Sequence, residues 1–195
     1  AAKRYSSGGL ALAEARILIV SDSHIPDRAD EIPGKIRDFM EEGKPYDIVV
    51  HAGDLTSREI LEYFSSLGSK IYIVQGNMDW LDLPESEVFE VHKVKIGVIH
   101  GDQVYPRGDL KGLTRIAADL GVRVLVWGHT HKPLLAKAGN VIHINPGSIT
   151  GAYSGAGASY GPSLVIATVG VLMDARLYSL DRDRVVEKHR LMEGF

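Results

Sequence analysis

The sequence predicts an α/β fold in which two mixed β-sheets pack together and are flanked by helices. In the first half of the chain, short β-branched runs alternate with segments of helical periodicity, which is the pattern of parallel strands joined by right-handed crossovers. The second half holds many short strands, which indicates a second, β-rich layer. No repeat or linker divides the chain. We therefore expect one domain over residues 16–195, preceded by an extension, native or left from cloning, over residues 1–15.

The first half is expected to run strand, helix, strand, helix, strand. Strands are predicted at residues 16–20, 47–50 and 70–74, where apolar and β-branched residues cluster before polar loops. Apolar residues recur at helical spacing from Ile32 to Met40 and again from Ile60 to Leu67, and a glycine follows each segment as an expected stop.

The second half is expected to contain one helix, at residues 108–120, among short strands. The Gly139-Asn140 pair is typical of a hairpin turn between two of them. The predicted strands cover residues 88–92, 94–100, 122–127, 134–137, 141–144, 163–169, 172–178 and 184–189.

Composition restricts the chemistry that the protein can perform. The 195 residues include eight His and no Cys, which excludes a disulfide scaffold, a thiolate zinc site and a cysteine nucleophile. The formal net charge of −3 gives no sign of a nucleic-acid surface, and no segment approaches the ~18 apolar residues of a membrane span. No GxGxxG motif follows the first strand, which argues against a Rossmann-type nucleotide-binding protein. We expect a cytoplasmic protein without membrane or nucleic-acid partners.

Asp, His and Asn residues gather directly after the predicted strands. They are Asp22, His24, Asp54, Asn77, His100, His129 and His131. These seven residues stand in five loops, each of which follows a predicted strand. The carboxyl ends of strands in an open α/β sheet line the ligand crevice, so the five loops can converge. Residues i and i+2 of an extended segment point the same way, so Asp22 should pair with His24, and His129 with His131. Seven O and N ligands are too many for one tetrahedral zinc and suit two divalent ions.

Each motif alone also has an ordinary explanation. Asp22 could cap a turn, His100 could be a packed core histidine, and the GHTH segment could be a surface loop. Five such motifs in chain order, each after a predicted strand, favour a metal site instead.

The motifs DSH, GD, GN, HG and GHTH, in this order and spacing, resemble those of the calcineurin-like metallophosphoesterase family. The segments HGDQVYPRGD and INPGSITGAYSG are similar to the small prokaryotic YfcE-type phosphodiesterases and to the related retromer scaffold subunit of eukaryotes. The resemblance covers about residues 16–180. It implies an α/β/β/α metallophosphoesterase sandwich, in agreement with the predicted strands.

The resemblance also implies a ligand set and a mechanism. Asp22, His24 and His131 would hold one metal; Asn77, His100 and His129 would hold the other; Asp54 would bridge both. Manganese is the expected metal, with iron, cobalt, nickel or zinc as alternatives. Two such ions lower the pKa of a bridging water toward ~7, so a bridging hydroxide would attack phosphorus in line. Asp54, Asn77 and His129 are the expected catalytic residues, and the expected substrate is a small-molecule phosphodiester.

The chain departs from the fuller family pattern at Met78, where many members have a histidine that protonates the leaving group. Methionine cannot donate a proton, and loss of a general acid removes roughly 10²–10⁴-fold of rate. We therefore expect modest activity that favours acidic leaving groups. Four further polar residues are expected to support the ligands or to form the substrate rim: Asp79, Asp102, Thr130 and Asn145.

The alternative function is a metal-binding protein-interaction scaffold with little or no catalysis, because the retromer subunit uses the same fold to bind partners. The presence of all seven ligand residues favours the enzyme. Relatives in this branch also imply a homodimer or a larger homo-oligomer.

Overall fold

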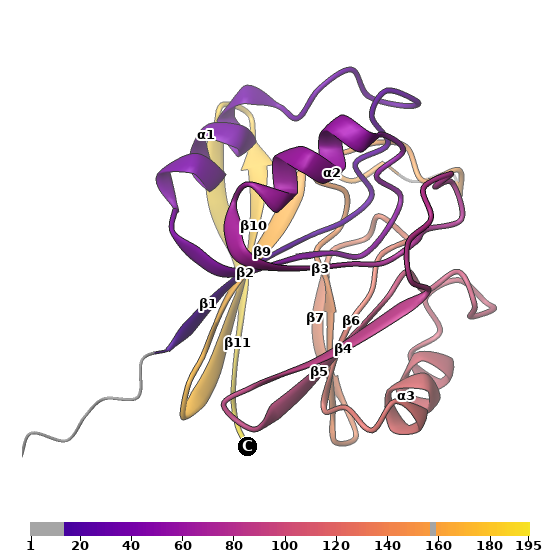
Figure 1. The fold of residues 1–195 in the computed structure, drawn as a ribbon, viewed down its shortest axis with the longest axis vertical. Coiled ribbons are helices and arrows are strands. Elements are labelled where there is room, and N and C mark those ends of the chain that lie inside the picture. Colours follow the sequence, from indigo (N-terminus) through magenta and orange to yellow (C-terminus); the bar gives the residue numbers. More distant parts are fainter. Residues whose placement is uncertain (1–13, 157–158) are drawn as a thin grey trace, which may run out of the picture.

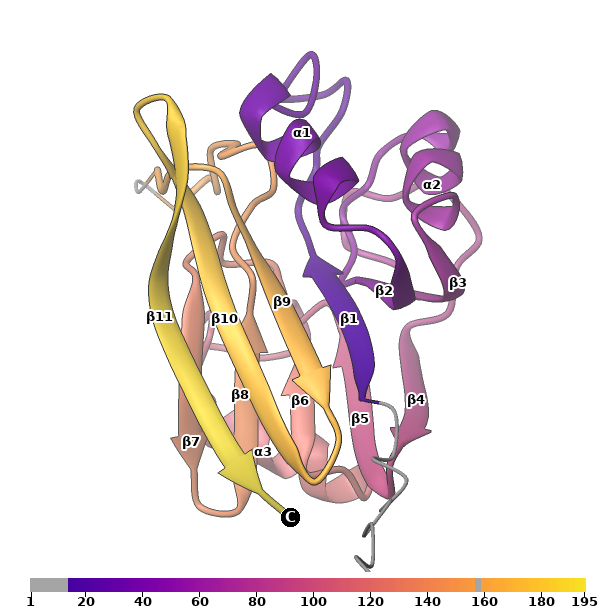
Figure 2. The same ribbon diagram turned by 90° about the vertical axis from the view of Figure 1, so that its left-hand side faces the viewer.

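Two β-sheets face each other in the computed structural model, which describes residues 14–156 and 159–195 (Figure 1). The first sheet contains β1 (Ala15–Val20), β2 (Tyr46–His51), β3 (Gly68–Ile73), β9 (Ser163–Val169), β10 (Leu172–Asp181) and β11 (Arg184–Gly194). The second contains β4 (Ser86–Val91), β5 (Val94–Ile99), β6 (Val124–Val126), β7 (Leu134–Ala138) and β8 (Val141–Asn145). Figure 2 shows the sheets as two layers, one behind the other.

Both sheets are mixed. The strand order is β11-β10-β9-β1-β2-β3 in the first sheet and β4-β5-β6-β8-β7 in the second. β1, β2 and β3 pair in parallel, as the alternation of strands and helices predicts, whereas β9 runs antiparallel to β1. The expected architecture of two packed mixed sheets is confirmed.

Helices α1 (Gly34–Glu42) and α2 (Arg58–Ser65) lie on the outer face of the first sheet, and α3 (Leu110–Asp119) lies on the outer face of the second (Figure 1). Ile36 and Met40 of α1 and Phe64 of α2 are fully buried against the first sheet. Leu113 of α3 is buried against the second. No helix in the part of the chain that the structure describes is long and apolar enough to cross a membrane.

The last four residues of β1, residues 17–20, are apolar without alternation. Ile17 and Ile19 face the core between the sheets, while Leu18 and Val20 face the core beneath the helices. A strand that is buried on both faces needs apolar residues at successive positions. Packing on both faces therefore fixes the position of the carboxyl end of β1, and with it the start of the loop that follows.

Several predicted boundaries are wrong. The first helix begins at Gly34, two residues after Ile32, because Pro33 occupies its N-cap with extended backbone. Gly68 does not end a helix but begins β3, where it pairs with Tyr46. A side chain at Gly68 would crowd Val49, which explains the glycine.

The predicted strand through His92 also ends earlier, at Val91. His92 and Lys93 have φ values of 49° and 67° and form the two-residue turn between the paired Val91 and Val94. Such hairpin turns need left-handed backbone at both central positions. The predicted N-terminal extension lies outside the described residues up to residue 13, and Ala15 already belongs to β1.

Candidate metal centre

The seven expected ligands all follow strands, on loops that meet at one edge of the molecule. Asp22 and His24 follow β1, Asp54 follows β2, Asn77 follows β3, His100 follows β5, and His129 and His131 follow β6. Short distances link all of them. The links join Asp22 to His131, His131 to His24, His24 to Asp54, Asp54 to His100, and His100 to Asn77 and His129.

The backbone at these positions is not extended, so the expectation of i and i+2 side chains on one strand face is wrong. Five of the seven residues have left-handed φ values between 47° and 64°: Asp22, His24, Asp54, His129 and His131. This region costs a non-glycine residue of order 1–3 kcal/mol and is found at functional sites.

Hydrogen bonds between neighbouring loops hold this strained backbone. The N–H of Asp22 donates to Gly53 O at 3.0 Å, and the N–H of His24 donates to Asp54 O at 3.0 Å, which extends the pairing of β1 with β2. The N–H of His129 donates to Asp22 Oδ1 at 3.2 Å and ties the GHTH loop to the first loop. The ligand loops therefore behave as one hydrogen-bonded unit.

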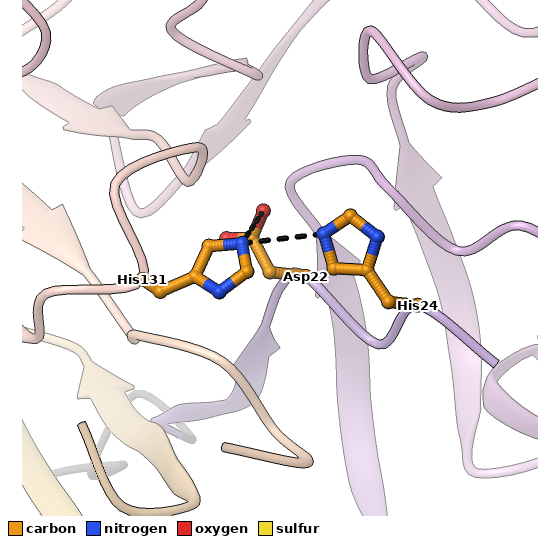
Figure 3. Close-up of side chains that lie close together, drawn as sticks. All are labelled: Asp22, His24 and His131. Carbon is orange, nitrogen blue, oxygen red and sulfur yellow. Dashed lines mark hydrogen bonds and ion pairs between the residues drawn. The ribbon is translucent and has the colours of Figure 1, made fainter. Parts of the chain in front are cut away.

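The first cluster consists of Asp22, His24 and His131, all buried (Figure 3). His131 Nε2 lies 3.4 Å from Asp22 Oδ1 and 3.2 Å from His24 Nε2. The Nδ1 of His131 donates to the carbonyl of Ala152 at 2.7 Å, which leaves the lone pair on Nε2, aimed at the cluster.

The second cluster joins Asp22 and Asp54 to His100. His100 donates from Nδ1 to the carbonyl of Ala52 at 2.7 Å, and its Nε2 lies 3.4 Å from Asp54 Oδ2 and 3.1 Å from Asn77 Oδ1. The same Oδ2 of Asp54 is 3.3 Å from His24 Nε2. One carboxylate oxygen therefore contacts imidazole groups of both clusters, as a bridging ligand requires.

These residues fit divalent metal ions. Asp22 Oδ2 is buried and has no hydrogen-bond partner among the described residues, which is costly for a carboxylate oxygen without a cation. The donors are imidazole nitrogens, carboxylates and an amide oxygen, a set that first-row divalent metals accept. Asp22, His24, Asp54, His100 and His131 are all almost fully buried, so a bound ion would be shielded from bulk water.

The site is electrostatically coupled. Burial acts to raise the pKa of Asp54, but its hydrogen bond to His100 and the charge of that histidine hold the pKa at about 2. Burial acts to lower the pKa of His100, but Asp54 and Asp22 raise it to about 9. Burial lowers the pKa of His24 and of His129 to about 4. A metal ion held by His100 would have to displace the proton of this side chain, so its affinity should rise with pH.

The polar residues expected around the ligands take different positions. Asp79 accepts backbone N–H bonds from Asp54, Thr56 and Gly76, each at 2.8 Å. Asn145 donates from Nδ2 to Gly128 O and Thr130 Oγ1 and holds the GHTH loop. Asp102 and Thr130 line cavities beside the ligands.

Sequence reasoning missed the groups that orient the imidazoles, which are the carbonyls of Ala52 and Ala152. It also missed Arg107, whose guanidinium donates to the carbonyls of His129 and Ser154. Backbone acceptors leave no mark on a sequence. The sequence signal for Arg107 is its position as a cationic residue within the segment HGDQVYPRGD.

Comparison with known proteins agrees with this geometry. Residues 16–168 match the model of the calcineurin-like phosphoesterase superfamily domain, and the chain belongs to this family. A probable metallophosphoesterase of Methanocaldococcus jannaschii is 45% identical over 132 residues, which are 68% of this chain and 67% of that protein. The predicted family is confirmed, and its probable metallophosphoesterase relatives support a phosphoesterase hydrolase.

Solved structures share the fold over nearly the whole chain. Vacuolar Protein Sorting 29 of Cryptosporidium parvum is similar with a TM-score of 0.88 at 27% identity, covering 93% of this chain and 99% of that one. A structure of Vps29 from Entamoeba histolytica complexed with zinc is 31% identical, with a TM-score of 0.84 and coverage of 91% and 98%. A metal-binding relative with this fold therefore exists.

Proposed function

We propose that this protein is a phosphodiesterase that hydrolyses small-molecule phosphoesters with two divalent metal ions. The observation that carries the proposal is the position of Asp54, whose Oδ2 lies within 3.4 Å of imidazole nitrogens from both clusters. A carboxylate that lies between the two clusters has enough lone pairs to coordinate two ions.

The residues divide into two metal sites. Asp22, His24 and His131 would hold one ion, Asn77, His100 and His129 would hold the second, and Asp54 would contact both. Bound divalent ions would lower the pKa of water and neutralise charge that develops on the phosphoryl oxygens. Manganese is the metal we expect, and iron, cobalt, nickel and zinc also suit these ligands.

The protein's own part is to keep these ligands available and fixed. The Ala152 and Ala52 carbonyls take the Nδ1 protons of His131 and His100, so both rings present Nε2 in a set direction. Asn77 and His129 lie at the solvent side of the site, where an ester can approach, and we assign them with Asp54 to catalysis.

Met78 restricts the substrates. Its backbone N–H donates to Asp54 Oδ1 at 2.8 Å, and its side chain is 40% exposed beside the ligands. A thioether cannot protonate a departing alkoxide. The leaving group must therefore depart as a stable anion, so diesters of acidic alcohols should react fastest.

The test combines metal analysis with hydrolysis of bis(4-nitrophenyl) phosphate in the presence of Mn²⁺ and other divalent ions. Asp54→Asn and His129→Ala should each reduce metal-dependent turnover by about 10²-fold or more. The matched control is His189→Ala, an exposed histidine of β11, which should keep wild-type rates. Full metal occupancy without hydrolysis of any mono- or diester would overturn the proposal.

A protein-interaction scaffold is the second candidate, favoured by the similarity to Vacuolar Protein Sorting 29 over 93% of the chain. A scaffold does not need seven clustered ligand residues, five of them almost fully buried, so the enzyme is preferred. The experiment above separates the two functions. We further propose a cytoplasmic homodimer or larger homo-oligomer, which light scattering at several concentrations would test.

A further inference from the structure

Two cavities of opposite charge lie beside the metal-binding clusters. The larger, of about 430 Å³, has Arg107 and Lys132 in its wall and no acidic residue among those described around it. The smaller, of about 280 Å³, is lined by three acidic residues and, within the described chain, by no basic one. Thr130 in the larger cavity follows the ligand His129, and the ligand Asn77 lines the smaller one. The smaller cavity is thus lined by an expected ligand, and the larger one is connected to the centre through Arg107, which donates to the carbonyl of His129.

Arg107 brings an uncompensated positive charge to the larger cavity. Its Nη1 donates to Ser154 O at 3.2 Å and its other terminal nitrogen donates to His129 O, so both of its protein contacts are with neutral carbonyls. Among the described residues it has no carboxylate partner. A guanidinium has five N–H donors, so donors remain for an anion.

Lys132 adds a second free cation. Its side chain is exposed and forms no ion pair with any residue in the described ranges. Its backbone N–H bonds to Thr130 Oγ1, which keeps it next to the GHTH loop. The cation is therefore placed close to the expected ligands.

Trp127 lies buried in the same cavity wall. Trp127 is 3% exposed, and its Nε1–H has no hydrogen-bond partner in the part of the chain that the structure describes. The remaining wall is largely apolar, with Leu110, Leu134 and Tyr160. Such a cavity suits a carbon skeleton that carries an anionic group.

We propose that the substrate is a phosphodiester with two unlike arms. The arm in the larger cavity carries a second negative charge, held by Arg107 and Lys132. The other arm faces Glu85 and Asp102 and is uncharged or cationic. This inference rests on the proposed function and adds the class of diester that the site selects.

The test uses three matched diesters that share 4-nitrophenol as the leaving group. Their second arms are 4-carboxyphenyl, 4-nitrophenyl and 4-(aminomethyl)phenyl. The wild type should have the highest kcat/KM for the carboxylate. In Lys132→Glu, the ratio of kcat/KM for the carboxylate to that for the amine should fall by about tenfold or more, mainly through KM.

The matched control is Lys35→Glu, an exposed lysine of α1 that makes the same change in net charge. It should leave the ratio unchanged. An unchanged ratio in Lys132→Glu, or an equal change in Lys35→Glu, would overturn the inference.

A binding measurement separates this inference from the proposed function. Calorimetry with metal-loaded protein should show that 4-carboxyphenyl phosphonate binds about tenfold tighter than phenyl phosphonate, and that Lys132→Glu removes this preference. If this preference is present but no ester is hydrolysed, the proposed function fails and the anion-binding cavity is supported. If the esters are hydrolysed without charge preference, the cavity assignment is wrong.

Discussion

Replacing Asp79 by alanine should destabilise the protein and weaken its metal binding together. The Asp79 carboxylate accepts three backbone N–H bonds at 2.8 Å, from Asp54, Thr56 and Gly76. These bonds join the loop after β2 to the loop after β3, which supply Asp54 and Asn77. Burial raises the pKa of Asp79, while the three N–H groups favour its anion.

The magnitude follows from the three bonds. A hydrogen bond to a charged group contributes about 1.5–3 kcal/mol, but three donors that share one half-buried carboxylate do not add fully. We expect a loss of about 4 kcal/mol in the free energy of unfolding, which is a large part of the ~5–15 kcal/mol of a typical protein. The melting temperature should fall by roughly 8–16 °C for a chain of this size.

Urea unfolding of the metal-free protein measures the stability, and titration with Mn²⁺ measures the affinity. Asp79→Ala should weaken metal binding by about 10–100-fold, although Asp79 is not an expected ligand. Asp79→Asn should lie between alanine and wild type, because its one carbonyl oxygen accepts fewer of the three bonds. The control is Asp82→Ala, an exposed carboxylate three residues further along. A stability of Asp79→Ala within about 0.5 kcal/mol of the wild type would refute the reasoning.

Three further outcomes are expected. Gly76→Ala should abolish metal binding in a titration, because the added Cβ would overlap the backbone N and Oδ1 of Asp54, whereas Gly34→Ala, which meets nothing within 4 Å, should bind metal normally. Met78→His should raise kcat for diesters with poorer leaving groups by up to about 10²-fold and make the rate depend less on leaving-group pKa; no change would mean that residue 78 does not reach the substrate. Burial lowers the pKa of His143 below its usual 6.5, so the unfolded chain binds a proton that the folded protein does not. The part of the stability that depends on neutral His143 is therefore complete above pH 6.5 and is lost as the pH falls below it. His143→Gln should reduce the slope of urea midpoints between pH 6.5 and pH 5; an unaltered slope would contradict the assignment.

The fold was predictable where local pattern and burial agree. β1 is apolar at every position from residue 17 to residue 20 because both faces of the strand are buried there, and such a run marks a central strand. β11 was predicted only to residue 189, whereas it extends to Gly194. Its last residues are mostly exposed at the edge of the sheet, so pairing with β10 rather than an apolar pattern determines its length. Pairings between distant segments, such as β1 with β9, leave no local signal.

The site was predictable because chemistry-bearing residues follow strands, and parallel strands end at a common edge. All seven expected ligands lie together, yet the reason given for the pairing of Asp22 with His24 was wrong. Their left-handed backbone depends on hydrogen bonds to Gly53 O and Asp54 O, which belong to another loop. Conformations imposed by contacts distant in sequence cannot be read from the local spacing of residues.

The anchoring of His100 and His131 by backbone carbonyls has a consequence for how this site tolerates mutation. A side-chain acceptor in either place could be lost through a single codon change, whereas the carbonyls of Ala52 and Ala152 persist whatever side chain occupies those positions. Most substitutions around the two imidazole rings therefore leave their orientation unchanged. Sequence drift in the surrounding loops can then alter which ester fits the cavities while the ligand geometry stays the same, so new substrate preferences can arise without a new metal site.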